Sequence, residues 1–263
     1  MLLQHLYHIP YVVSEHSSSF GTRTLNLSWV ILARLAYPRA RRVLGVNRNF
    51  PEDFGYYDIR CDFRYLSNGI DTQVFYPPAA PARQPLVLHC SMFRELKRVP
   101  DLVRAFALVQ DEFPQTRLEL AGDGEERPLA ERLARELLHP GSYVFHGVLS
   151  KPRLADLMRQ AAVFVLPSQF ESQSCVLLEA MACGTPVIAT RVADIPALVG
   201  TGQGILVEPG DIPGLALALR AVLGGESVFD AQETAIYAAR NFSLRVVGRM
   251  LHEEHARARD LRP

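Results

Sequence analysis

Two glutamates, Glu171 and Glu179, stand out in the stretch PSQFESQSCVLLEAMACGTPVIAT. Glu179 is the one polar side chain in the run CVLLEAMAC. An ionised carboxylate is costly to bury without a partner, so Glu179 either faces solvent, pairs with a basic side chain or accepts hydrogen bonds from a ligand. Residues around Ser172–Cys175 would present backbone N–H groups at the start of a helix, and such groups bind hydroxyls or phosphate oxygens. Two acceptors that flank a set of donors favour a polyhydroxylated, anionic ligand.

A basic cluster lies in SMFRELKR (91–98), where Arg94, Lys97 and Arg98 follow an apolar run. One arginine side chain can donate two parallel hydrogen bonds to a phosphate, and lysine supplies a compact positive charge. The two residue types together therefore suit a diphosphate. A basic turn exposed to solvent is the alternative, and it would be favoured for an isolated run. GDG (122–124) primarily predicts a tight turn, and a loop that binds a ligand is the second interpretation.

Apolar runs that alternate with amphipathic stretches must position these residues. The runs are 86–90, 117–121, 143–147, 163–167, 185–190 and 204–208, and the stretches include 101–113 and 151–162. Runs that are continuously apolar predict strands buried on both faces, as in a parallel sheet. Strands that alternate with helices predict a doubly wound α/β domain. Such sheets bind ligands at the carboxyl ends of their strands, so we expect the glutamates and the basic cluster to share that edge.

The rest of the chain also reads as α/β. Residues 1–84 contain expected strands at 9–16 and 41–46, a strand that runs into a turn at 63–71, and an expected helix at 25–37. The stretch 77–85 is rich in Pro and Ala and is a linker candidate. The stretch 229–261 is expected to be helical, with Ser243 as a helix N-cap.

Composition excludes several classes of function. The chain has 263 residues, 28 basic and 28 acidic side chains and a pI near 7.1, so charge gives no reason to expect nucleic acid or an anionic membrane as the main partner. The sequence has no run of about 18 apolar residues, so it predicts no membrane-spanning helix. The first residues, MLLQHLYHIPYVV, do not resemble a signal peptide. The cysteines form no CxxC pair, which argues against a metal site and favours reduced thiols in the cytoplasm: Cys61, Cys90, Cys175 and Cys183.

The span from about Leu86 to Leu223 resembles the C-terminal, nucleotide-sugar-binding domain of the retaining glycosyltransferases of family 4. The resemblance is carried by Asn68–Asp71 with Phe75 and Pro77, by Lys97, by AGDG (121–124), by the E-x7-E pair Glu171 and Glu179, and by EAMACGTPVIAT (179–190). It implies the GT-B architecture of two Rossmann-type domains. It further implies that a hexose or N-acetylhexosamine moves from a UDP- or GDP-linked donor to an acceptor hydroxyl with retention, without a metal or other cofactor.

The resemblance also assigns roles in binding the donor. Lys97 would contact the diphosphate, and Gly122 would line the same site. The family's arginine after the first strand falls at Met92 here, so Arg94 is the expected substitute. The spacing FRxxKR (93–98) is similar to the N-acetylglucosaminyl-L-malate synthases. Gly147 and Val148 would lie against the base.

Other roles concern the sugar and the ribose. Glu171 would meet the hydroxyls of the donor sugar, helped by the backbone N–H groups of Ser174, Cys175 and Val176. Glu179 would accept from the ribose diol. His16, at the end of IPYVVSEH, is the candidate that reaches the donor sugar, so His16 and Glu171 are the expected catalytic residues.

Two further departures from the family pattern follow Glu171, and the first of them leaves the identity of the sugar open. The usual Phe-Gly is Gln173-Ser174 here, and a residue larger than glycine would narrow the sugar pocket. The usual Gly-Gly-x-Pro-Glu appears as 193–197, ADIPA.

The resemblance predicts three regions: a partial N-terminal, acceptor-side domain with its linker (1–84), a nucleotide-sugar-binding domain (85–224) and C-terminal helices (225–263). Because residue 1 falls near the middle of the family's first domain, we expect an unpaired sheet edge or exposed apolar surface in 1–84 and weak turnover by this chain. A truncated or non-catalytic nucleotide-sugar-binding module is the alternative function. The acceptor could be a glycan, a lipid-linked sugar or a small hydroxy acid. A cytoplasmic location is expected, with peripheral attachment to the inner membrane face as an alternative.

Overall fold

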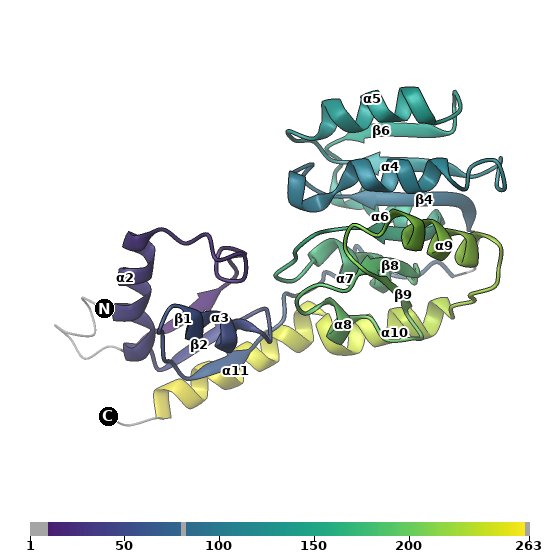
Figure 1. Cartoon of the computed structure of the whole chain (residues 1–263). Coiled ribbons are helices and arrows are strands. Elements are labelled where there is room, and N and C mark those ends of the chain that lie inside the picture. Colours follow the sequence, from purple (N-terminus) through teal and green to yellow (C-terminus); the bar gives the residue numbers. More distant parts are fainter. Residues whose placement is uncertain (1–9, 80–82, 261–263) are drawn as a thin grey trace. The chain divides into compact units, whose positions relative to one another are not determined.

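The protein is described by a computed structural model that covers residues 10–79 and 83–260 (Figure 1). These residues form two compact units. The first unit runs to Gly69 and also includes Glu171–Gln173 and the chain from Leu244, while the second comprises Ile70–Phe170 and Ser174–Ser243. The start of the strand expected at 9–16, most of the stretch considered as a signal peptide, and residues 80–82 of the expected linker lie outside the described residues. The three regions expected from the sequence stay predictions.

The second unit is built on one parallel sheet. In the described residues the strands lie in the order β6-β5-β4-β7-β8-β9. Their bounds are β4 (Gln84–Cys90), β5 (Arg117–Ala121), β6 (Tyr143–Gly147), β7 (Ala161–Leu166), β8 (Val187–Thr190) and β9 (Gly204–Val207). Every pair is parallel, and the central register sets Leu88 against Phe164. This is the strand order of a doubly wound dinucleotide-binding sheet.

Helices cover both faces of this sheet (Figure 1). On one face, α4 (Val99–Ala107), α5 (Arg127–Leu137) and α9 (Ile212–Leu223) share a core with the strands. On the other, α6 (Lys151–Gln160), α7 (Cys175–Ala182), α8 (Ile195–Leu198) and α10 (Ala231–Phe242) do so. The strands are therefore buried on both sides, as their continuous apolar runs predict.

Local sequence signals set where the helices begin. The Asp230 carboxylate caps α10 by accepting from Glu233 N at 2.9 Å, and Asp211 caps α9 by accepting from Gly214 N at 2.9 Å. Prolines stand in the first turn of α4, α5, α6, α8 and α9, where no N–H is needed.

Two sequence predictions of element bounds are wrong in part. The helix expected at 101–113 ends at Ala107, and the chain continues in turns closed by bonds such as Val109 N to Phe106 O at 3.0 Å. The linker expected at 77–85 overlaps the sheet, because Gln84 and Pro85 already belong to β4. That strand lies beside β7, and this pairing with a distant segment leaves no local signal.

The first unit has a smaller parallel sheet of β1 (Val12–Glu15), β2 (Arg42–Gly45) and β3 (Phe63–Tyr65) in the order β1-β2-β3 among the described residues. It carries α2 (Leu27–Ala36), the short helix η1 (Tyr37–Arg39), α3 (Phe50–Tyr56) and the C-terminal α11 (Leu244–Asp260). Its core is aromatic: the Phe20 ring packs edge-on against Phe54 at 4.9 Å between centroids.

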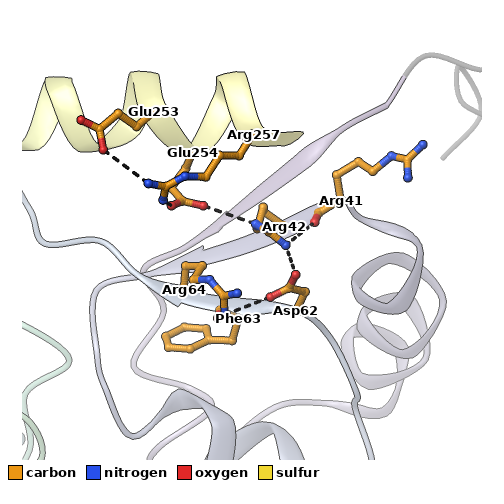
Figure 2. Close-up of polar contacts among 8 residues, drawn as sticks. All are labelled: Arg41, Arg42, Asp62, Phe63, Arg64, Glu253, Glu254 and Arg257. Carbon is orange, nitrogen blue, oxygen red and sulfur yellow. Dashed lines mark hydrogen bonds and ion pairs between the residues drawn. The ribbon is translucent and has the colours of Figure 1, made fainter. Parts of the chain in front are cut away.

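Ion pairs fix α11 to the sheet of the first unit (Figure 2). The buried Arg42 guanidinium of β2 pairs with Asp62 and, through Nε at 3.3 Å, with Glu254 Oε2 of α11. Asp62 also pairs with Arg64, and Glu254 with Arg257. Since Arg42 and Glu254 are both buried, each neutralises a charge that would otherwise be costly to bury.

Helix α2 exposes large apolar side chains. Leu27, Trp29 and Ile31 are 74, 59 and 50% exposed. Of the two forms expected for 1–84, exposed apolar surface is found among the described residues of this segment. Among the described residues, no helix is long and apolar enough to cross a bilayer.

Candidate functional site

Three strand-end loops of the second unit and the end of β6 meet at the carboxyl edge of its sheet. The loop after β4 is bonded to the loop after β5 through Phe93 N to Asp123 O at 2.9 Å. The loop after β5 is bonded to the end of β6 through Gly122 N to Gly147 O at 2.7 Å. The loop after β7 joins the first through Gln169 N to Leu96 O at 2.7 Å. Neighbours β4 and β7 are where the chain reverses its order, and ligands bind at such a switch point.

The GDG turn packs against the loop after β4. Gly122 has a φ of +123°, and a Cβ on it would lie 1.8 Å from the Ser91 carbonyl oxygen. Gly124 has a φ of +153°, and its Cβ would lie 2.6 Å from the Phe93 carbonyl oxygen. Both glycines are explained by backbone conformation and close approach. The donor-binding role of Gly122 stays a prediction.

The basic cluster divides into two parts. Arg94 precedes and Lys97 ends the short helix η2 (Glu95–Lys97), with Arg94 exposed and Lys97 half-buried. Arg98 instead takes a left-handed φ of +50°, and its Nε donates to Asp101 Oδ2 at 2.6 Å in the first turn of α4. Arg98 thus serves the start of α4, which leaves Arg94 and Lys97 as the diphosphate candidates.

Glu179 is a buried carboxylate of α7 beside the end of β4. Burial raises its pKa, and the nearby Lys151 at the start of α6 opposes that rise. In turn, burial and the Glu179 charge raise the pKa of Cys90, the last residue of β4, to about 12. Of the possibilities open from the sequence, exposure to solvent is therefore excluded. Lys151 was missed by sequence reasoning because its α6 helix lies 28 residues earlier in the chain.

The other expected residues of the E-x7-E stretch lie before and within α7. Glu171 is buried in the loop after β7 and belongs to the first unit by its contacts. Ser174 occupies the N-cap position of α7 and is buried, Cys175 is the exposed first residue, and Val176 is half-buried. Val148, after β6, is 81% exposed. Their expected roles stay predictions.

Gln173, one of the departures from the family pattern, is a buried amide with three partners in the first unit. Its Oε1 accepts from Asn68 N at 2.6 Å and from Ser67 Oγ at 3.2 Å, and its Nε2 donates to Tyr65 Oη at 2.8 Å. A phenylalanine could make none of these bonds, so the departure has a structural reason here.

His16 lies in the first unit directly after β1. The side chain is exposed, and its Nε2 lies 2.8 Å from Ser14 Oγ. The expected role of His16 toward the donor sugar stays a prediction.

His89, in the middle of the apolar run LVLHC, is fully buried in β4. Burial lowers its pKa to about 4, and the nearby Lys97 charge adds to this. Sequence reasoning missed it, although a histidine inside a buried strand is a signal for a specific hydrogen-bond partner.

A depressed histidine pKa makes stability depend on pH. Because the unfolded ring takes up a proton near pH 6.5 and the folded ring only near pH 4, the stabilisation is complete above 6.5 and declines as the pH falls through that window. Relative to His89→Asn, the wild-type free energy of unfolding should drop by about 3 kcal/mol more between pH 7 and 4. Urea unfolding across this range measures the difference, and parallel pH profiles would contradict it.

Comparison with known proteins identifies the family. Residues 84–224, more than half of the chain, match the family described as glycosyl transferases group 1. The chain belongs to this family. Among its glycosyltransferase relatives, N-acetyl-alpha-D-glucosaminyl L-malate synthase of Bacillus anthracis is 40% identical over 165 residues, which cover 59% of this chain and 42% of that protein. A D-inositol 3-phosphate glycosyltransferase of Mycolicibacterium smegmatis is 32% identical over 187 residues, 65% of this chain and 42% of the relative. The match thus spans about two fifths of each of these relatives.

Solved glycosyltransferase structures share the fold. A sucrose-phosphate synthase from Thermosynechococcus elongatus aligns with a TM-score of 0.83 at 23% identity, over 97% of this chain and 69% of that one. HepE from Anabaena, solved in complex with UDP, aligns with a TM-score of 0.86 at 19% identity, over 97% of this chain and 74% of that one. The GT-B fold and the family resemblance expected from the sequence are therefore confirmed.

Proposed function

We propose that this chain binds a nucleotide-diphosphate sugar at the carboxyl edge of the six-stranded sheet and transfers its hexose or N-acetylhexosamine to an acceptor hydroxyl with retention. One observation carries the proposal. The loop that holds Arg94 and Lys97 is bonded to the loop after β7 at the switch point, and it follows directly on Cys90, whose pKa the buried Glu179 carboxylate raises. A nucleoside diphosphate requires positive charges for its phosphates and a hydrogen-bond acceptor for its ribose diol, and this edge of the sheet offers both.

In this proposal the positive charges of Lys97 and Arg94 stabilise the diphosphate as the glycosidic bond breaks. Backbone N–H groups at the start of α7, from Ser174 to Val176, add donors at the positive end of the helix dipole. The leaving phosphate takes the proton of the acceptor hydroxyl, so no protein base is needed for that step. Glu171 is assigned to the sugar hydroxyls, and His16 keeps the catalytic role toward the donor sugar that the sequence predicts.

Glu179 is assigned to the ribose. Its pKa is raised by burial, and a diol that donates two hydrogen bonds to the ionised carboxylate would offset the cost of burying that charge. The donor proposed is UDP-linked, supported by the complex of HepE with UDP, and a small hydroxylated acceptor is supported by the names of the malate and inositol phosphate relatives.

The test is nucleotide binding by the Glu179→Gln variant. Loss of a charged acceptor should weaken UDP binding by about 1–3 kcal/mol, since hydrogen bonds to charged groups contribute on that order. Isothermal calorimetry with UDP, GDP and uridine measures this, with Glu136→Gln on the exposed side of α5 as the matched control. Equal affinity of the variant and the wild type for every nucleotide would rule out the ribose assignment. Absence of binding by the wild type would overturn the proposed function.

A further inference from the structure

His89 connects the two central strands to the loop that follows β4. Its Nδ1 lies 2.8 Å from the Val165 carbonyl oxygen of β7, and its Nε2 lies 2.7 Å from Ser91 Oγ. A carbonyl oxygen can only accept, so Nδ1 carries the proton. In the neutral ring Nε2 must then accept, and the Ser91 hydroxyl donates to it. The polar hydrogen and lone pair of the ring are both used.

Ser91, the first residue of the loop, is held from three directions. Its hydroxyl donates to His89, its N donates to Ala121 O at 3.2 Å, and its carbonyl oxygen packs closely against Gly122. The direction in which the chain leaves β4 is thereby fixed. Arg94 and Lys97 follow only three and six residues later, so a rotation at Ser91 would displace both cations.

The ring must also stay neutral for this arrangement. Burial keeps the pKa of His89 at about 4, and the charge of Lys97 also lowers it. A protonated ring would lose its acceptor for Ser91 and would repel the Lys97 ammonium group. A neutral histidine therefore supports a cationic loop where a charged residue could not.

We propose that His89 is a positioning residue for the diphosphate loop, residues 91–98, and that it acts through the Ser91 hydroxyl. This inference rests on the proposed function, because it assigns the loop to the donor diphosphate. His89 itself does not touch the ligand, so its effect should appear in the affinity for diphosphate and not in the affinity for the nucleoside.

Two variants separate the bonds of the ring. Asparagine at position 89 can place an amide N–H near the position of Nδ1 and keep the bond to Val165, but it offers no acceptor to Ser91. Ser91→Ala removes the other partner of the same bond. Thr185→Val is the matched control, because Thr185 Oγ1 donates to the buried Met158 carbonyl at the opposite edge of the sheet. The double variant of His89→Asn and Ser91→Ala tests whether the two residues act as one unit.

Calorimetry with UDP and uridine should show a five- to tenfold loss of UDP affinity, roughly that of one hydrogen bond, for each single variant. Uridine affinity should change less than twofold, and the double variant should lose no more UDP affinity than either single one. Thr185→Val should leave the ratio of the two affinities unchanged. Equal losses for UDP and uridine, or losses that multiply in the double variant, would overturn the proposal.

Amide hydrogen exchange without ligand gives an independent readout. Exchange in the loop should accelerate in His89→Asn and in Ser91→Ala, and should be unchanged in Thr185→Val. Unchanged exchange in the first two variants would show that His89 does not hold the loop, even if nucleotide affinity falls. If the wild type binds neither UDP nor GDP, the proposed function fails and with it the diphosphate role, whereas the exchange data still decide whether His89 holds the loop.

Discussion

Replacing Lys97 with alanine is expected to weaken UDP binding by about 10- to 100-fold, since a charged hydrogen bond contributes roughly 1.5–3 kcal/mol. Arg94→Ala should act in the same direction with a smaller loss, because Arg94 is exposed and its charge is better screened. Uridine carries no phosphate, so its affinity should change less than twofold in both variants. Calorimetry with the two ligands measures the contrast.

The control for this experiment is Arg132→Ala, which removes an exposed cation of α5 from the same unit. It should leave both affinities unchanged. Raising the salt concentration should weaken UDP binding by the wild type and have less effect on Lys97→Ala, because the screened charge is then already absent. Equal losses of UDP and uridine in Lys97→Ala would show that the loop contributes to folding and not to diphosphate binding.

Replacing Gly122 with alanine is expected to lower the free energy of unfolding by about 3 kcal/mol or more. The φ of +123° is strained for any residue with a Cβ, and that Cβ would lie 1.8 Å from the Ser91 carbonyl oxygen. The atom in the way belongs to the backbone, so a side-chain rotation cannot relieve the clash. Thermal unfolding should show a fall in Tm of roughly 6–12 °C.

Gly141→Ala is the matched control. Gly141 also has a positive φ, +84°, but a Cβ there would meet nothing within 4 Å. The control should therefore cost only the backbone strain, about 1 kcal/mol. If both variants lost the same stability, the packing of the GDG turn against Ser91 would not be the cause.

Local apolar patterns were enough to predict the alternation of strands and helices. The end of α7 also has a local cause, because Gly184, with a φ of +75°, follows the helix and Pro186 cannot continue it. The family could be predicted because its most specific landmark, the E-x7-E pair followed by EAMACGTPVIAT (179–190), is a contiguous motif that needs no tertiary contact to be recognised.

Only the tertiary structure decided which of these residues work together. Arg98 and Lys97 are neighbours in the sequence, but the Arg98 side chain is bound to Asp101 and so has a different role from Lys97. His89 forms a hydrogen bond with the carbonyl oxygen of Val165, 76 residues away in the sequence, and Gln173 accepts one from the N–H of Asn68, 105 residues away. A buried polar group needs a hydrogen-bond partner, and the order of the strands decides which distant residues come close enough to supply one. That order leaves no local pattern in the sequence.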